Sequence, residues 1–156
     1  MSVKKKNASN GAYYIAFIVY CVFMLWLLFG RRQYQFDGNF EEALDALVNL
    51  RPLKTISAYL YVLENREDAY LRNVAAYNLL GNIALFIPYG IFLPFLFKRL
   101  RKCWKTLLIG VITIVCVELL QFVTLRGSCD IDDLILNMIG IFIGYLMYRV
   151  THLKRE

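Results

Sequence analysis

Residues 133–144 read DLILNMIGIFIG, and this stretch constrains how the rest of the chain can fold. It is almost wholly apolar, yet Asp133 and Asn137 lie one helical turn apart on the same face. Gly140 and Gly144 follow at the spacing that lets a second helix backbone approach closely inside a membrane. The stretch therefore predicts a membrane helix that packs tightly on a neighbour and carries polar groups beside that contact.

The composition also indicates a membrane protein. Of the 156 residues, 59% are hydrophobic, whereas soluble domains contain about 45–50%, and the mean hydropathy is +0.49. Spanning helices need roughly 20 mainly apolar residues. Four segments come near this length, at residues 12–29, 79–97, 106–125 and 134–150. The predicted fold class is all-α, an integral membrane bundle of four transmembrane helices that forms a single domain over residues 1–156.

The distribution of charge predicts how these segments are oriented. The N-terminus, the connection between the second and third segments and the C-terminus together hold eleven basic residues and one acid, Glu156. The other two connections hold seven basic residues and ten acids. Basic residues accumulate on the cytoplasmic side of membrane proteins, so both termini of this multi-pass cell-membrane protein are expected in the cytoplasm. This bias explains the net charge of +6 without a nucleic-acid partner.

The connection between the first two segments, residues 30–78, is long and contains helical patterns. Asn39 and Glu42 form a candidate capping box, and apolar residues at helical spacing follow it. A second apolar pattern runs from Ile56 to Leu63. We expect extracytoplasmic amphipathic helices here, which either lie on the membrane surface or form a small cap on the bundle.

Polar side chains within the spanning segments fall, in this orientation, in the half of the bilayer that faces the exterior. Such groups are costly in a bilayer, so their convergence at one depth indicates a site. The five residues are Asn82, Glu118, Gln121, Asp133 and Asn137. Asn78 precedes Asn82 by one turn on the same face. An isolated buried charge is too costly to persist, so Glu118 is expected to be neutral or paired, with Arg126 as the candidate partner.

Four further residues are expected to be structural. Pro88 lies near the middle of the second segment, where it removes a helical hydrogen bond and should kink the helix to shape a cavity. An ordinary transmembrane proline is the alternative, because bilayers tolerate proline in helices. Gly90, Gly140 and Gly144 are interpreted as positions of close packing.

Acidic residues before the fourth segment allow two interpretations. Asp130 is a good N-cap, and acids suit the positive end of a helix. Asp130, Asp132 and Asp133, together with Glu118, also offer the oxygen ligands that divalent cations prefer. The three cannot all face inward from one helix start, so we expect neither a metal nor another cofactor. Asp130 and Asp133 are retained as candidate ligand-binding residues together with Asn137, which lies on the same face.

Taken together, the motifs resemble the VanZ-like family. They run from Asn82-x2-Leu85-Phe86-x-Pro88-x-Gly90 through Glu118-x2-Gln121 to Arg126-x3-Asp130-x2-Asp133-x3-Asn137-x2-Gly140-x3-Gly144. Upstream, the stretch 49–55 is similar to the entry motif of that family, with Leu53 where phenylalanine is usual. The resemblance covers residues 49–148.

The resemblance implies a cell-envelope protein linked to resistance against teicoplanin and lipoglycopeptides, with no established reaction. One hypothesis is a non-enzymatic protein whose outer-leaflet pocket engages a lipid-tailed ligand, using Asn78, Asn82, Glu118, Gln121, Arg126, Asp130, Asp133 and Asn137. Another is an intramembrane enzyme acting on a lipid-linked cell-wall precursor or a phospholipid head group, with Glu118, Asp133 and Arg126 as candidate catalytic residues. In a third, the polar residues only hold the bundle together. Membrane lipids are the expected partners, and the sequence is compatible with either a monomer or a homo-oligomer.

Overall fold

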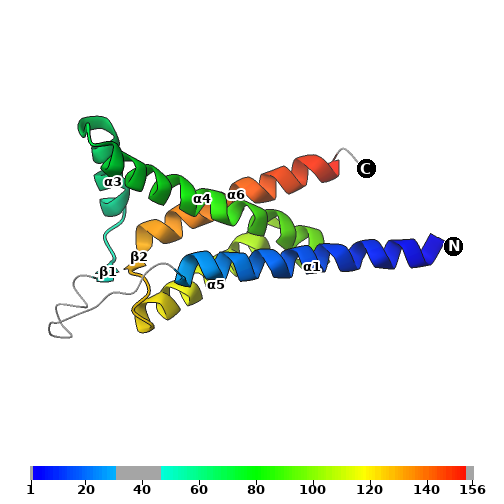
Figure 1. The fold of residues 1–156 in the computed structure, drawn as a ribbon. Coiled ribbons are helices and arrows are strands. Elements are labelled where there is room, and N and C mark those ends of the chain that lie inside the picture. The colour runs from blue at the N-terminus through cyan, green and yellow to red at the C-terminus, as the bar shows by residue number, and fades with distance from the viewer. Residues whose placement is uncertain (1, 31–46, 154–156) are drawn as a thin grey trace.

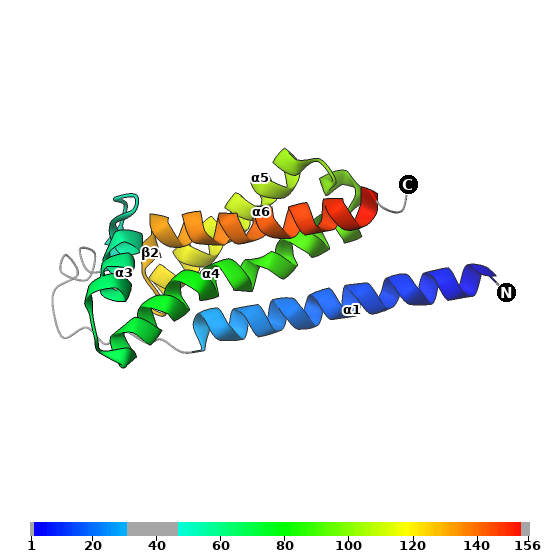
Figure 2. The ribbon, with the colours of Figure 1, turned by 90° about the horizontal axis from the view of Figure 1, so that it is seen from above.

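The computed structural model describes residues 2–30 and 47–153, and these are mainly helical (Figures 1 and 2). In chain order the elements are α1 (Ser2–Phe29), β1 (Val48–Asn49), α3 (Lys54–Asn65), α4 (Ala69–Leu96), the 3-10 turn η1 (Lys98–Leu100), α5 (Cys103–Val123), β2 (Cys129–Asp130) and α6 (Ile131–Leu153). The two strands pair in parallel, with Val48 opposite Cys129. This short pairing joins the start of α6 to the chain that leads into α3.

Four helices are long and apolar enough to cross a membrane, which confirms the predicted number of spans. They cover Gly11–Phe29, Ala69–Leu96, Cys103–Val123 and Ile131–His152. Both views show the described chain ends at one end of the bundle, with α3 and the two strands at the opposite end (Figures 1 and 2). The chain is therefore a multi-pass membrane protein.

The second span begins much earlier than predicted. The sequence placed residues 30–78 in the connection, but α4 starts at Ala69. The cause is a helix cap, because the Asp68 side chain accepts the backbone N–H groups of Tyr70 and Leu71. The second predicted amphipathic pattern lies in α3, whereas the predicted capping box of Asn39 and Glu42 lies outside the described residues.

Helices α4 and α6 meet backbone to backbone. A Cβ atom added at Gly140 would lie 2.2 Å from the carbonyl oxygen of Ile83, and one added at Gly144 would lie 2.1 Å from that of Ile87. No larger side chain fits at such distances. The two glycines therefore place α6 directly against the middle of α4, as their four-residue spacing predicted.

Gly90 makes the reciprocal contact from α4, since a Cβ there would lie 2.1 Å from the Ile141 carbonyl oxygen. Large apolar side chains surround this junction. The buried cluster consists of Met24, Phe86, Tyr89, Leu93, Ile114 and Ile141. Small residues at the contact and large ones around it give the bundle its packed centre.

Helix α1 is much more exposed than the other three. Its apolar side chains, Ile15, Ile18, Val19 and Val22 among them, are more than half exposed, as expected of a surface that faces lipid. It is attached to α4 by specific contacts. The Tyr20 hydroxyl donates to the Leu85 carbonyl oxygen at 2.7 Å, and the Phe17 and Phe92 rings lie 5.5 Å apart.

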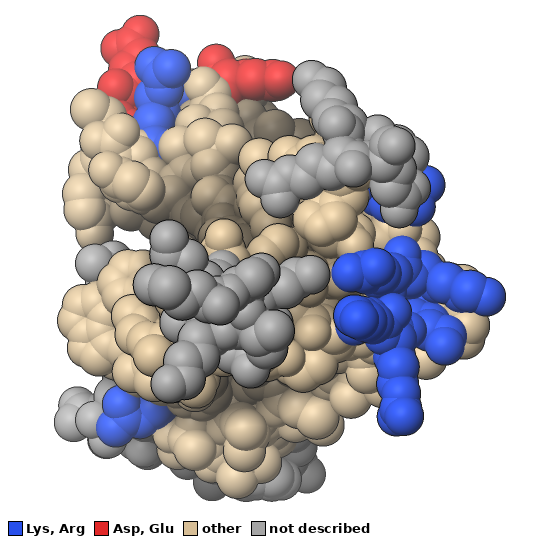
Figure 3. Space-filling view, turned by 90° about the vertical axis from the view of Figure 1, so that its right-hand side faces the viewer, with Lys and Arg blue, Asp and Glu red and all other residues tan. Residues whose placement is uncertain are grey.

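Basic side chains gather at the end of the bundle that carries the chain ends. Figure 3 looks onto this end and shows Lys and Arg side chains collected on one side of it. The connection between α4 and α5 supplies Lys98, Arg99, Arg101, Lys102 and Lys105. No Asp or Glu interrupts this run.

The helix contact predicts a position-dependent effect of alanine. Gly144→Ala should destabilise the protein by about 1–3 kcal/mol, because the new methyl group forces α4 and α6 apart. Gly81→Ala is the matched control on α4, where nothing lies within 4 Å of the added atom. Unfolding of the purified protein by SDS titration in micelles measures both, and equal stability of the two variants would contradict the contact.

Candidate functional site

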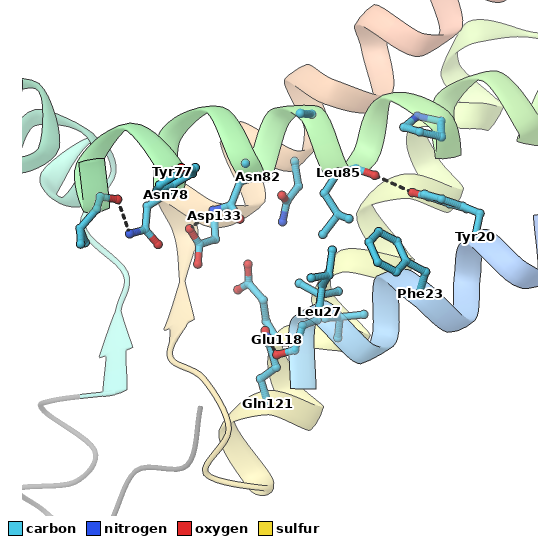
Figure 4. A pocket seen from close by; sticks show the side chains of 17 residues that line it. Tyr20, Phe23, Leu27, Tyr77, Asn78, Asn82, Leu85, Glu118, Gln121 and Asp133 are labelled. Atoms are coloured by element: carbon cyan, nitrogen blue, oxygen red, sulfur yellow. Dashed lines mark hydrogen bonds between the residues drawn. The ribbon is translucent and has the colours of Figure 1, made fainter. Parts of the chain in front are cut away.

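A cavity of about 930 Å³ lies among α1, α4, α5 and α6 (Figure 4). Its lining has two chemical characters. An apolar wall includes Phe23, Leu27 and Leu28 of α1, Leu85 of α4 and Val117 of α5. The lining also contains polar side chains, namely Asn78, Asn82, Glu118, Gln121, Asp133 and Asn137. The cavity is therefore amphiphilic, with one side suited to hydrocarbon and the other to a polar group.

The glycine contact between α4 and α6 aligns the first polar pair. Asn82 precedes Ile83, whose carbonyl touches Gly140, so this turn of α4 lies close to the first turns of α6. Asn82 Nδ2 donates to Asp133 Oδ1 at 2.5 Å. A hydrogen bond to a carboxylate within a membrane helix pair adds directional attraction to the packing.

Glu118 is the buried carboxylate at the centre of the site. It is 7% exposed, and its Oε1 has no hydrogen-bond partner within the described protein. Its Oε2 is 3.9 Å from Cys129 Sγ. Figure 4 shows Glu118 and Asp133 directed toward the same space. Asn137 is 5% exposed and likewise has a carbonyl oxygen, Oδ1, without a protein partner.

Of the two alternatives expected for Glu118, the pairing with Arg126 is wrong, and the structure leaves Glu118 unpaired among the described residues. Arg126 instead donates from Nη1 to the Phe29 carbonyl oxygen at 2.7 Å, at the end of α1. The reason is the turn after α5, where Leu125 adopts a positive φ of 54° and redirects the chain. Among the described residues no cation pairs with Glu118, and Arg126 does not line the cavity.

Gln121 lines the cavity but also has a structural contact. Its Nε2 donates to the Leu28 carbonyl oxygen at 3.0 Å. Together with the bond from Arg126, this ties the last turn of α1 to the end of α5. Backbone carbonyls at a helix end lack intrahelical partners, so both side chains satisfy groups that would otherwise remain unpaired.

Asp130 belongs to the junction beside the cavity rather than to its lining. Its Oδ1 accepts from Asn49 Nδ2 at 3.0 Å and from the backbone N–H of Asp132 at 2.9 Å. Its Oδ2 accepts from the Thr55 hydroxyl at 2.6 Å. The sequence placed Asp130 among the ligand-binding residues, but these contacts engage both of its oxygens in capping α6 and holding the strand pair.

Asp132, close to the cavity at the start of α6, has a capping role that the sequence analysis did not predict. It is fully buried and accepts backbone N–H groups from Leu53, Thr55 and Ile56 at 2.5, 2.7 and 3.0 Å. These groups open α3, so a carboxylate from α6 caps a helix distant in sequence. Two features of the sequence could have indicated this cap, namely the motif at residues 49–55 and Asp132 itself, an acid to which no structural contact had been assigned.

The apolar wall from α1 was also not predicted as part of the site. Tyr20, Phe23, Leu27 and Leu28 carry no motif that distinguishes them from other lipid-facing residues of a spanning helix. Pro88, by contrast, does line the cavity, within a helix that continues to Leu96. Six of the eight predicted ligand-binding residues line it, and Arg126 and Asp130 do not.

The site contains little support for metal or thiolate chemistry. In the described ranges no three His, Cys, Asp or Glu side chains group as metal ligands do. Burial raises the pKa of the Cys129 thiol, and the negative charge of Glu118 raises it further. A higher pKa keeps the thiol protonated, whereas nucleophilic cysteines need the thiolate form.

Comparison with known proteins identifies relatives. The sequence profile of the VanZ/LLP1 family matches residues 17–152. Among curated proteins, the chain is similar to Protein VanZ of Enterococcus faecium, with 27% identity over 134 residues. The match covers 86% of this chain and 71% of the relative. No solved structure matches the chain.

The cap on α3 gives a local test of the junction. Asp132→Asn should increase amide hydrogen exchange at Leu53, Thr55 and Ile56 by roughly ten-fold or more, because the carboxylate bonds are charge-assisted and the amide offers only one acceptor oxygen. Glu64→Gln, an exposed change on the same helix, should leave these amides protected. Unchanged exchange in Asp132→Asn would show that the carboxylate does not hold α3.

Proposed function

The chain belongs to the VanZ/LLP1 family, and from that premise we propose that it contributes to teicoplanin and lipoglycopeptide resistance. In this proposal the amphiphilic cavity engages a lipid-tailed ligand at the outer leaflet of the cell membrane. The observation that carries the proposal is Glu118, which is 7% exposed, lines the cavity and keeps an oxygen without a protein partner. Buried polar groups of this kind are retained mainly where they have a function.

The two walls of the cavity support a ligand with a tail. Hydrocarbon would lie along Phe23, Leu27 and Leu28 of α1, where its burial is favourable. The polar end would then meet Asn82, Asp133 and Asn137 on the facing helices. The volume of about 930 Å³ lies within the range of about 300–1,000 Å³ for small-molecule sites.

The charge distribution supports the outer-leaflet location. The connection between α4 and α5, which holds the basic run from Lys98 to Lys105, lies at the end of the bundle with the chain ends (Figure 2), where Figure 3 shows Lys and Arg side chains gathered. Under the positive-inside rule that end faces the cytoplasm. The cavity, with Asn78 and Asp133 in its lining, would then open from the opposite half of the membrane.

A resistance assay tests this proposal. Wild type, Glu118→Gln and the surface control Glu64→Gln are expressed at matched membrane levels in a sensitive Gram-positive host. Wild type and Glu64→Gln should raise the inhibitory concentrations of teicoplanin and dalbavancin, which carry lipid tails, and leave that of vancomycin unchanged. Glu118→Gln should return both to the empty-vector value, because it removes the ionisable carboxyl group without changing the side-chain shape.

Two results would contradict the proposal. Equal resistance to a de-acylated teicoplanin would mean that the tail is not recognised. Full resistance from Glu118→Gln would mean that the residue only holds the bundle together, since the amide still forms hydrogen bonds.

An intramembrane enzyme is the second candidate, favoured by the presence of Glu118 and Asp133 in one cavity. Glu118 would act as general acid or base on a lipid-linked cell-wall precursor or a phospholipid head group, and Asp133 would orient it. Arg126, the third candidate catalytic residue, would have to leave the Phe29 carbonyl oxygen before it could stabilise developing negative charge.

The enzyme hypothesis predicts a changed lipid. Mass spectrometry of membrane extracts should reveal a species that accumulates with wild type and Glu64→Gln but not with Glu118→Gln. Extracts identical to those of the empty-vector strain would rule out the enzyme while leaving the binding function intact.

A further inference from the structure

We propose that the polar side of the cavity recognises a primary ammonium group attached directly to a hydrocarbon tail. This inference concerns the same cavity as the proposed function but goes beyond it, because an acyl tail such as that of teicoplanin ends in a carbonyl group and not in an ammonium group. It follows from three properties of the cavity lining, namely its charge, its unpartnered oxygens and the engagement of its amide groups.

The charge of the lining favours a cation. Among the 17 lining residues, Glu118 and Asp133 are acids, and none is lysine, arginine or histidine. An anionic head group such as a phosphate would meet two carboxylates and no compensating charge from the lining. A cation would instead supply the partner that lets a buried Glu118 ionise, and the low dielectric of a buried site strengthens the attraction between the two charges.

Two buried oxygens in the site lack protein donors. Glu118 Oε1 comes from α5 and Asn137 Oδ1 from α6, at side chains that are 7% and 5% exposed. Both residues line the same cavity. Because buried acceptors normally have a donor, the natural ligand group is one with several N–H bonds, and a primary ammonium has three.

Three of the four amide side chains in the lining, those of Asn78, Asn82 and Gln121, already donate an N–H group to a protein oxygen. Asn78 Nδ2 donates to the Val74 carbonyl at 2.8 Å, and Asn82 Nδ2 donates to Asp133. Gln121 Nε2 donates to the Leu28 carbonyl. These bonds reduce the number of amide N–H groups available to a ligand, whereas Glu118 Oε1 and Asn137 Oδ1 still need donors, and this combination favours a donor-rich ligand.

The apolar wall indicates that the ammonium group of the ligand is attached directly to its hydrocarbon tail. Leu85 and Val117 line the same cavity as Glu118, which lies within a membrane-spanning helix. A tail that follows this wall brings its first atoms next to the acceptors. An amine joined directly to the tail fits this depth, whereas the phosphate of a phospholipid would come between the two.

Binding to the full-length protein in phosphatidylcholine nanodiscs tests the inference by calorimetry, with empty nanodiscs subtracted. The probes share one tail: dodecylammonium, dodecyltrimethylammonium, which has the charge but no N–H, and dodecanol, which has a donor but no charge. Butylammonium tests for a soluble amine. Dodecylammonium should bind about ten-fold or more tighter than each of the other probes. Dodecyltrimethylammonium and dodecanol cannot form charge-assisted hydrogen bonds to the buried carboxylate, and butylammonium lacks the long tail.

Variants locate the effect. Glu118→Gln should lower the affinity for dodecylammonium by about ten-fold or more and bring it near that for dodecanol, whereas Glu64→Gln should leave it unchanged. Asn137→Leu removes the second acceptor at similar volume and should also weaken binding. It keeps the test valid if Glu118→Gln fails to fold.

The outcomes separate this inference from the proposed function. Equal affinities for the three dodecyl probes would overturn ammonium recognition while tail binding, and with it the proposed function, stands. Butylammonium binding as tightly as dodecylammonium would overturn the tail. Ammonium preference without any drug resistance in the host would leave the inference standing and remove the resistance function.

Discussion

The contact between the α4 and α6 backbones is the constraint on which the rest of the structure depends. It exists because Gly90, Gly140 and Gly144 have no side chains at the points where the helices touch. Water offers no driving force for helix association inside a bilayer, so close packing and polar contacts must supply it. Once this pair is fixed, Asn82 and Asp133 necessarily lie side by side, and one wall of the cavity is formed.

A second set of contacts organises the end of the bundle beside the cavity. Asp130 and Asp132 lie next to each other at the start of α6 but face different partners. One holds Asn49 and Thr55, and the other caps α3. This division leaves Asp133 as the one of the three aspartates that lines the cavity. Of the three aspartates at the start of α6, two are therefore structural and one, Asp133, is the candidate functional carboxylate.

The sequence predicted the spans and most of the cavity lining because hydropathy and helical spacing are local properties. It could not predict the role of Asp132, whose partners are more than 70 positions away along the chain. The early start of α4 was not predicted because the helix begins at a cap formed by Asp68 and not at a change in hydropathy. The wrong partner for Arg126 arose from a single turn conformation at Leu125. The α1 wall was unpredictable since apolar residues that face a cavity and those that face lipid have the same composition.

The central claim is that a lipid tail enters the cavity and brings a polar group to Glu118. The most direct test is photolabelling of the full-length protein with a teicoplanin analogue whose acyl tail carries a diazirine, followed by peptide mapping. The account predicts adducts at Leu27, Leu28 and Leu85, and loss of these adducts in Glu118→Gln. Adducts confined to the exposed face of α1, at Ile15, Ile18 or Val22, and unchanged in the variant would contradict it, because they would show only contact with the surrounding lipid.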